Sequence, residues 1–348
     1  LFDSLRRLYI LQIFVEDDSV TEIMINGTEH IFIERGGRLQ KLDQGFDSPE
    51  KLQDVIQQIV AGCNRIVNEA SPIVDARLAD GSRVNVVMNP VALNGPIVTI
   101  RRFPARPVKM DWLVRNHSLS EQAALFLENL VKAGYNIFIS GGTGSGKTTF
   151  LNALSQFIPA EERVITIEDS AELQLQGLPN LVRLETRNGN TEGCREIGIR
   201  ELIRSSLRMR PDRIIVGEVR GPEAVDMLQC LNTGHDGSMS TGHANSGRDM
   251  LARLESMVLM GLELPLAAIR QQIASGIDIA IHLGRLRDRS RRVLEITEIL
   301  GFESNEIKLN TLFEFEEAGE DNEGRSIGNF HKRGTLFREN KLKAAGLS

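Results

Sequence analysis

Residues 135–149 read YNIFISGGTGSGKTT and place a short apolar run directly before a glycine-rich turn. Within this stretch, residues 141–148 satisfy the pattern G-x-x-x-x-G-K-[ST] in full. Glycines let the backbone adopt positive φ and turn N–H groups toward an anion, and a helix that begins at the last glycine adds the positive end of its dipole. The stretch therefore predicts a strand, a phosphate-binding loop and a helix, in that order.

The side chains of this Gly-rich loop (residues 141–148) indicate a magnesium nucleotide as the ligand. Lys147 is expected to reach the β- and γ-phosphates, and the Thr148 hydroxyl is expected to bind Mg²⁺. The alternative is a turn that merely connects a strand to a helix, and the apolar residues 137–140 and the helix-like residues 150–158 argue against it. We expect ATP to be bound by Gly142, Thr143, Gly144, Ser145, Gly146, Lys147, Thr148 and Thr149.

Changes in periodicity along the chain predict two domains. Residues 1–103 alternate in the β manner around one helical stretch, which is typical of a small α+β domain. Residues 104–118 are expected to form a linker. In residues 119–317, strand-like and helix-like segments alternate, which predicts an α/β domain whose parallel strands gather the chemistry at their C-terminal ends. Residues 318–348 are polar and weakly periodic, and we expect a partly ordered C-terminal appendage.

Two groups of carboxylates follow predicted strands. Glu218 ends the apolar run RIIVG, where an ATPase needs a group that activates water or holds the metal's water shell; an exposed strand-end glutamate is the alternative. Glu168, Asp169 and Glu172 follow the strand after the loop helix, although Asp169 or Ser170 could simply cap a turn. We expect catalytic roles for Glu218, Glu168 and Glu172, and metal binding by Thr148, Glu218 and Asp169.

Two histidines flank the segment DGSMS. A histidine at a strand end beside a γ-phosphate can sense it by hydrogen bonding, so we expect His243 to be catalytic and His235 to bind the nucleotide. Two histidines eight residues apart without a third ligand do not make a zinc site. The alternative is that both are structural.

Arg200, Arg204 and Arg208 are spaced four residues apart and form a stripe on one face of a predicted helix. A solvated stripe paired with Glu196 and Glu201 is the default interpretation. The alternative is a subunit interface that carries an arginine to a neighbour's phosphate, and we assign this catalytic role to Arg208. Three nearby arginines add to the positive charge of the stripe: Arg195, Arg210 and Arg213. Four arginines of the first domain could also reach a phosphate: Arg77, Arg83, Arg101 and Arg102.

Composition limits the class of protein. A net charge of −6 argues against a nucleic-acid footprint over the whole surface. Cys63, Cys194 and Cys230 are widely spaced, which indicates reduced thiols in a cytoplasmic protein without a zinc module. No window has the roughly 18 uncharged apolar residues of a membrane span, so any membrane association is expected to be peripheral. Because the chain begins at Leu1 instead of Met, we also expect a preceding segment.

Four segments resemble the nucleotide-site motifs of the secretion ATPase superfamily. GGTGSGKTT, ITIEDSAEL, LRMRPDRIIVGEVRG and NTGHDGSMSTGHANS resemble its Walker A, Asp-box, Walker B and His-box motifs. The segments VDARLADGSRVNVV and GPIVTIRRF look most like the tight-adherence (Flp, CpaF-like) pilus assembly branch. The chain lacks the four paired cysteines of the type II zinc module, which favours the pilus or type IV secretion branches.

The resemblance implies a small α+β N-terminal domain, a RecA-like P-loop ATPase domain and a homohexameric ring on the cytoplasmic side of the inner membrane. It assigns the Walker B role to Glu218 and places the first-domain arginines near the nucleotide. We expect a Mg²⁺-dependent ATPase that drives an integral inner-membrane platform protein to extrude pilin subunits. The alternatives are a type IV secretion ATPase, a nucleic-acid translocase, which the scarcity of Trp and Tyr disfavours, and a non-hydrolysing scaffold, which Lys147 and Glu218 disfavour.

Overall fold

The computed structural model describes residues 9–62, 66–78, 80–102, 107–187 and 195–347. The chain divides into two compact units, Leu1–Arg106 and Pro107–Ser348. The division falls inside the expected linker at residues 104–118, but that span also holds the short helix α4, Met110–Arg115. Among the helices that the structure describes, none is both long and apolar enough to cross a membrane.

The first unit is built on a six-stranded antiparallel sheet with the order β3-β2-β1-β6-β5-β4. Alternation explains it, because Val20, Ile23 and Ile25 of β1 are buried between exposed or half-buried residues. Helix α3 buries one apolar face in the same core, as its helical spacing predicts. The elements are η1 (Tyr9–Leu11), α2 (Gln12–Glu16), β1 (Val20–Asn26), β2 (His30–Arg35), β3 (Arg38–Lys41), α3 (Pro49–Gly62), β4 (Ile73–Arg77), β5 (Arg83–Val87) and β6 (Ile97–Arg101).

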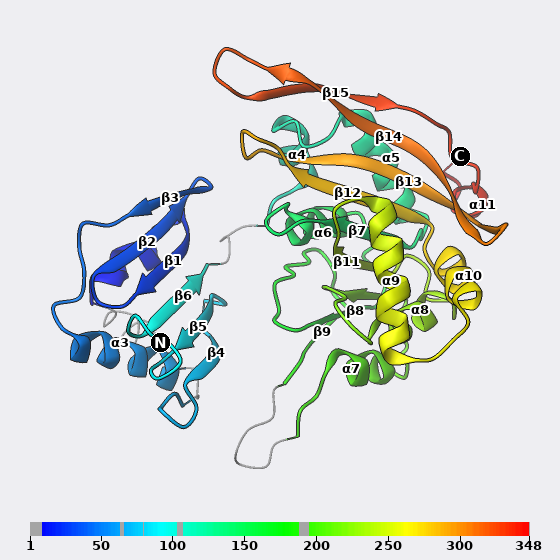
Figure 1. Cartoon of the computed structure of the whole chain (residues 1–348). Coiled ribbons are helices and arrows are strands. Elements are labelled where there is room, and N and C mark those ends of the chain that lie inside the picture. The colour runs from blue at the N-terminus through cyan, green and yellow to red at the C-terminus, as the bar shows by residue number, and fades with distance from the viewer. Residues whose placement is uncertain (1–8, 63–65, 79, 103–106, 188–194, 348) are drawn as a thin grey trace. The chain divides into compact units, whose positions relative to one another are not determined.

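The second unit contains a nine-stranded mixed sheet with the order β15-β14-β13-β12-β7-β11-β10-β8-β9 (Figure 1). The strands from β12 to β9 are parallel, and β13, β14 and β15 continue the sheet as antiparallel strands. Its strands are β7 (Ile137–Gly141), β8 (Val164–Glu168), β9 (Leu181–Glu185), β10 (Arg213–Val216), β11 (Met239–His243), β12 (Ile279–Arg285), β13 (Arg291–Glu303), β14 (Glu306–Glu320) and β15 (Ser326–Lys332). Parallel strands end at a common edge, so the loops after β7, β8, β10 and β11 meet there. The mixed α/β class predicted from the sequence is confirmed.

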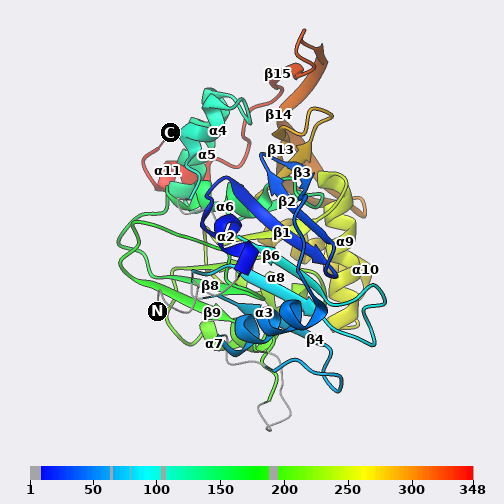
Figure 2. The same ribbon diagram turned by 90° about the vertical axis from the view of Figure 1, so that its left-hand side faces the viewer.

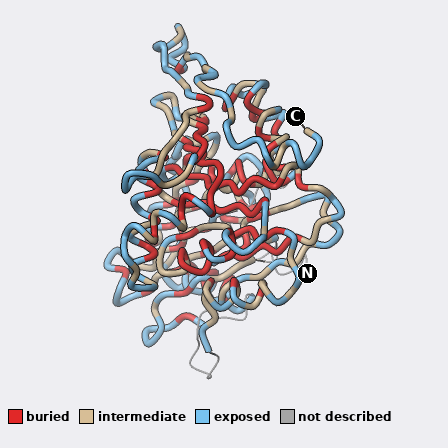
Figure 3. The backbone as a smooth tube through the Cα atoms, turned by 90° about the vertical axis from the view of Figure 1, so that its right-hand side faces the viewer, coloured by how far each residue is buried: buried red, intermediate tan, exposed pale blue. Residues whose placement is uncertain are grey.

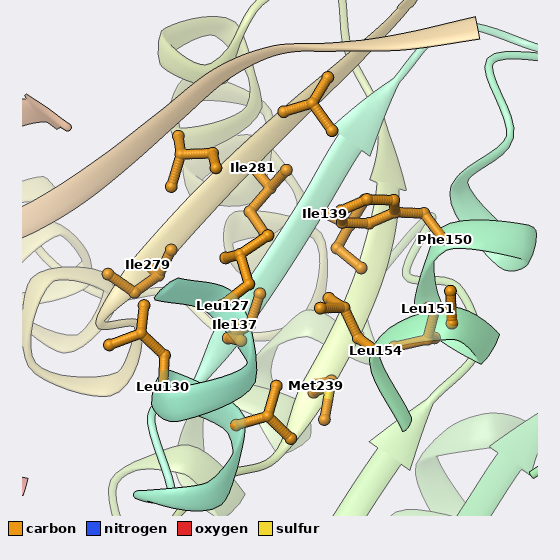
Figure 4. Packing of buried hydrophobic residues seen from close by; sticks show 14 of the residues in the cluster. Leu127, Leu130, Ile137, Ile139, Phe150, Leu151, Leu154, Met239, Ile279 and Ile281 are labelled. Atoms are coloured by element: carbon orange, nitrogen blue, oxygen red, sulfur yellow. The ribbon is translucent and has the colours of Figure 1, made fainter. Parts of the chain in front are cut away.

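Helices cover both faces of this sheet, as two separate hydrophobic clusters show. Leu127 and Leu130 of α5 and Phe150, Leu151 and Leu154 of α6 pack against the central strands on one face (Figure 4). On the other face, the core comes mainly from α8, α9 and α10. The remaining helices are α5 (Glu121–Lys132), α6 (Lys147–Ser155), α7 (Ile199–Ser206), α8 (Ala224–Leu231), α9 (Gly247–Gly261), α10 (Leu266–Gly276) and α11 (Asn340–Ala344).

The C-terminal residues differ from the expected appendage, because 318–332 belong largely to β14 and β15 of the main sheet. The segment that follows is held by buried carboxylates. Glu298, 1% exposed, accepts hydrogen bonds from the backbone N–H groups of Phe337 (3.0 Å) and Arg338 (2.7 Å). Lys341 Nζ lies 2.7 Å from Asp278 Oδ2. The weak periodicity hid this docking, since it depends on polar contacts to distant strands.

Burial separates the centre of the sheet from its antiparallel end. The central parallel strands β7, β8 and β10 of the second unit are buried along their whole length (Figure 3), whereas the edge strand β9 is exposed or half-buried. The far end of β14 is exposed, and Figure 2 shows the β14–β15 end rising past the helices of this unit. The stable parallel centre therefore carries the loops that are expected to hold the chemistry.

The described cysteine, Cys230, is a free thiol buried in α8, and burial raises its pKa to about 12. Cys63 and Cys194 lie outside the described residues. A thiol with so high a pKa is almost wholly protonated at neutral pH, so Cys230 acts as a small apolar core residue.

Candidate active site

The Gly-rich loop joins the end of β7 to the first turn of α6. Gly144 (φ 73°) and Gly146 (φ 94°) adopt the left-handed backbone conformation, which strains other residues. The Ser145 hydroxyl donates to Gly142 O at 2.9 Å and closes the loop on itself. Thr148 and Thr149 follow in the first turn of α6, so the loop has the strand-loop-helix context that its sequence predicts.

Lys147 is the buried cation of this loop, with 8% of its surface exposed. Its Nζ donates to the carbonyl oxygens of Gly141 and Gly142, both at 3.0 Å. The same Nζ lies 3.3 Å from Nδ1 of His243 at the end of the neighbouring strand β11. The ammonium group is thus held over the loop, where a phosphate would meet it.

Glu218 lies two residues beyond β10 and faces the same space. Its Oε1 is 2.8 Å from Nε2 of His243, and its Oε2 accepts from Nη2 of Arg220 at 2.7 Å. Burial alone would raise the pKa of Glu218, but the Arg220 hydrogen bond and the nearby charges of Arg220, His243 and Lys147 lower it below the usual value. Glu218 is therefore an anion at neutral pH.

His243 connects the ammonium group to the carboxylate. Burial and the charges of Lys147, Arg220 and Arg253 lower its pKa, although Glu218 opposes them. Nδ1 of His243 lies within hydrogen-bonding distance of Lys147 Nζ, whereas Glu218 Oε1, although 2.8 Å from Nε2, has no hydrogen-bond partner among the described residues. The three side chains form one chain of contacts across the ends of adjacent parallel strands.

Glu168, at the end of β8, is buried behind this chain. Its Oε1 accepts from the N–H groups of Glu172 (2.7 Å) and Leu173 (2.8 Å), whereas Oε2 is buried without a hydrogen-bond partner among the described residues. Burial raises the pKa of Glu168 to about 7 despite these two N–H groups. A Cβ on Gly217 would lie 2.8 Å from Cγ of Glu168, so this glycine makes room for the carboxylate.

The three Asp-box acids differ in exposure. Glu168 is buried, Glu172 is half-buried and Asp169 is exposed. The Glu168 carboxylate accepts hydrogen bonds from the backbone N–H groups of residues 172 and 173. The alternative considered from the sequence had assigned this turn-capping role to Asp169 or Ser170. Only Asp169 and Glu172 of this group therefore present carboxylates toward solvent.

A cavity of about 390 Å³ opens beside Glu218 and His243. Neither of the two arginines in its lining was predicted from the sequence. Arg220 stands two residues after Glu218, and this proximity was the available signal; Arg253 comes from α9, and no local pattern marks it. The lining residues are Thr143, Glu218, Val219, Arg220, His243 and Arg253.

His235 does not join His243. It precedes β11, whereas His243 ends that strand, so β11 separates the two histidines by at least about 13 Å. His235 Nδ1 instead lies 3.3 Å from Cys230 O and 3.4 Å from Thr233 Oγ1. Within its own chain, His235 therefore lies at the edge of the sheet opposite the Gly-rich loop, and nucleotide binding by His235 stays a prediction.

The arginine stripe on α7 has an acidic partner other than the predicted ones. Arg200 Nε and Arg204 Nε donate to the carboxylate of Asp226, at 2.6 and 2.7 Å, instead of facing Glu196 and Glu201. Asp226 is 3% exposed, so these two arginines neutralise a buried charge on α8. Because α7 ends at Ser206, Arg208 leaves the stripe and is exposed.

Three first-unit arginines form one row in the sheet. Arg77 pairs with Arg83 across β4 and β5, and Arg83 pairs with Arg101 across β5 and β6. Direct cross-strand partners share a face, and Glu22 continues this row on β1, with its Oε1 3.4 Å from Arg101 Nε. Arg102 is instead held within its own unit and donates to Val20 O at 3.2 Å.

Comparisons with known proteins agree with this geometry. A family model described as type II/IV secretion system protein matches residues 6–314. The chain is 32% identical to the conjugal transfer protein TrbB of Rhizobium radiobacter, over 88% of this chain and 92% of TrbB. It is also 32% identical to the type IV secretion system protein PtlH of Bordetella pertussis, over 83% of this chain and 93% of PtlH.

The crystal structure of the pilus retraction motor PilT shares the fold, with a TM-score of 0.59 at 20% identity over 97% of this chain and 88% of PilT. The chain therefore belongs to the type II/IV secretion system protein family and is an ATP hydrolase of that family.

Proposed function

We propose that the chain is the ATPase motor of a type IV secretion or conjugal transfer machine. The named relatives TrbB and PtlH support this branch more than the pilus-assembly role expected from the sequence. The observation that carries the ATPase chemistry is the chain of contacts from Lys147 through His243 to Glu218. It couples a cation at the phosphates to a carboxylate that can accept a proton.

The residues present fit a magnesium nucleotide. Two glycines in the left-handed conformation and a buried lysine suit a di- or triphosphate. Within the described residues, no group of three or more His, Cys, Asp or Glu side chains forms a metal site. Mg²⁺ usually takes few protein ligands and fills its shell with phosphate oxygens and water, so Thr148, Glu218 and Asp169 are sufficient candidates. When bound, Mg²⁺ would neutralise phosphate charge.

The protein's own residues divide the remaining work. Lys147 contacts the phosphates and disperses their charge. Glu218 is anionic and accepts the proton of the attacking water. The contact with His243 orients the Glu218 carboxylate. Glu168 holds the turn that carries Glu172 by accepting two of its N–H groups. These roles keep Glu218, Glu168, Glu172 and His243 in the candidate catalytic set.

Assembly completes the proposed motor. We expect a homohexamer, in which Arg208 of one subunit reaches the nucleotide of its neighbour and the row Arg77, Arg83 and Arg101 supplies further positive charge. The partner is expected to be an integral inner-membrane protein, held from the cytoplasmic side without direct binding of nucleic acid. The mild net negative charge of −6 supports a protein partner over a nucleic acid.

A replacement experiment in the host cell tests this function. The native gene is replaced by the wild-type or the Glu218→Gln form, and plasmid transfer, protein secretion and surface pili are measured in parallel. We expect Glu218→Gln to abolish transfer or secretion, and the membrane platform protein to be recovered with the wild-type chain from detergent extracts. Loss of surface pili with transfer and secretion intact would favour the pilus-assembly role instead.

A further inference from the structure

The β12–β13 hairpin brings two arginines to the Gly-rich loop from the side opposite Glu218. Strands β11 and β12 flank β7, and Glu218 and His243 lie on the β11 side. A Cβ built on Gly144 would lie 3.7 Å from Nη1 of Arg285, and one on Gly146 would lie 3.2 Å from Cδ of Arg291. Both arginine side chains therefore lie against the backbone of the loop.

These two arginines are also direct partners across the hairpin, since Arg285 of β12 pairs with Arg291 of β13. Direct partners point to the same face, so the two guanidinium groups lie on one side of the hairpin. A phosphate beside both groups could accept a charge-assisted hydrogen bond from each. Both residues are exposed, so an anion from solution can reach them.

The hairpin is held firmly to the loop and to its own neighbours. A Cβ on Gly141 would lie only 2.5 Å from Leu283 O, so β12 and the start of the loop are in close backbone contact. The turn is closed by Asp288, which accepts from the N–H groups of Ser290 and Ser326, both at 2.9 Å. The backbone that carries the two arginines is therefore fixed beside the loop before a ligand arrives.

We propose that Arg285 and Arg291 form a phosphate clamp that binds the nucleotide within the same chain. The inference rests on the proposed nucleotide site in the Gly-rich loop. Lys147, which also contacts His243 of β11, then meets the phosphates from the β11 side, and the clamp contacts them from the β12 side. The clamp is distinct from Arg208, whose proposed role crosses a subunit boundary.

Binding of a fluorescent ADP analogue, mant-ADP, to the purified full chain tests the clamp. The variants are Arg285→Gln, Arg291→Gln and the double variant, and Arg287→Gln in the turn of the same hairpin is the matched control. Each clamp variant should raise Kd roughly tenfold or more, because a charge-assisted hydrogen bond is lost. Arg287→Gln should change Kd less than about twofold, and Arg285→Lys should recover part of the affinity because it retains the charge.

Two further measurements separate binding from folding and from the site itself. Without nucleotide, all hairpin variants should melt within about 2 °C of wild type, as surface substitutions do, while the stabilisation by mant-ADP shrinks in the clamp variants alone. Lys147→Ala reports on the loop site. If Lys147→Ala loses binding while the double clamp variant binds like wild type, the clamp is wrong and the nucleotide site stands; if Lys147→Ala also binds like wild type, the nucleotide site itself is wrong.

Discussion

The two edges of the parallel sheet use buried charge in opposite ways. At the N-terminal edge, Arg213 is 1% exposed, and its guanidinium donates to Glu162 (Oε1 at 2.8 Å) and to Val131 O (2.7 Å). At the C-terminal edge, Glu168 keeps one buried oxygen without a hydrogen-bond partner among the described residues, and Lys147 is bonded to loop carbonyls.

The difference separates a structural site from a reactive one. Buried charges that are fully paired hold secondary-structure elements together. Gly237 leaves room for the Arg213 guanidinium, because a Cβ on this glycine would lie only 2.6 Å from Arg213 Cζ. At the C-terminal edge, Glu168 Oε2 and Glu218 Oε1 are buried without a hydrogen-bond partner among the described residues, and such atoms are typical of functional sites. Substitutions at the C-terminal edge should therefore alter turnover, and those at the N-terminal edge should alter stability.

Lys147→Ala should produce the largest effect on turnover. The N–H groups of the loop remain, but the buried cation that meets the phosphates is lost, so ATP hydrolysis should fall at least about a thousandfold. Melting temperature should stay close to wild type, because no core side chain is removed. Wild-type phosphate release from the purified variant would show that the reactive edge has been assigned wrongly.

Arg213→Met tests the structural edge. It leaves the Glu162 carboxylate and the Val131 carbonyl without their partner, so the free energy of unfolding should fall by about 3–5 kcal/mol. Chemical denaturation measures this loss, and the folded fraction should hydrolyse ATP with a near-normal KM. A large fall in kcat without a loss of stability would show that Arg213 serves turnover, and would contradict the structural role of the N-terminal edge.

Glu168 should make stability depend on pH. The pKa of Glu168 in the folded protein, about 7, exceeds its value in the unfolded chain. The contribution of Glu168 to the free energy of unfolding is therefore complete below about pH 4.5 and is lost as the pH rises through 7, by at most about 3 kcal/mol. Denaturation of wild type and Glu168→Gln from pH 5 to 8 measures this change. The difference in stability should shift in favour of the Gln variant as pH rises, and a constant difference would contradict the burial argument.

Arg208→Ala should have the smallest effect on dilute protein, less than about twofold, because an exposed side chain contributes little before assembly, but it should strongly lower the turnover of assembled rings. Specific activity should rise with protein concentration as rings form. Rings mixed from Arg208→Ala and Glu218→Gln subunits should regain part of the activity, since their defects lie in different subunits. Full activity of dilute monomer, together with no recovery in verified mixed rings, would return Arg208 to a solvated surface.

The sequence predicted the parts of the site whose geometry is local. The Gly-rich loop and Lys147 follow from one short pattern, and Glu218 follows from its place after an apolar strand. His235 and His243 occupy similar Thr-Gly-His segments, and only the strand bounds reveal that one precedes β11 and the other ends it.

Contacts between distant residues were beyond local patterns. Asp226 follows the α7 arginines by more than twenty positions, so their pairing depends on how α7 and α8 pack. Arg285 and Arg291 become partners only through the register of β12 and β13. The docking of the C-terminal segment on Glu298 was missed for the same reason, since a polar segment gives no periodic signal of its partners.

In the proposed mechanism, the Glu218 carboxylate activates water at a nucleotide held by the Gly-rich loop. The most direct test measures mant-ATP affinity and phosphate release on the same preparations of wild type and Glu218→Gln, which preserves size and hydrogen bonding while removing the charge. We expect Kd to stay within about threefold and kcat to fall at least roughly a hundredfold, the loss expected for one general base. An unchanged kcat with normal binding would contradict the claim and transfer the role to Glu172 or Glu168.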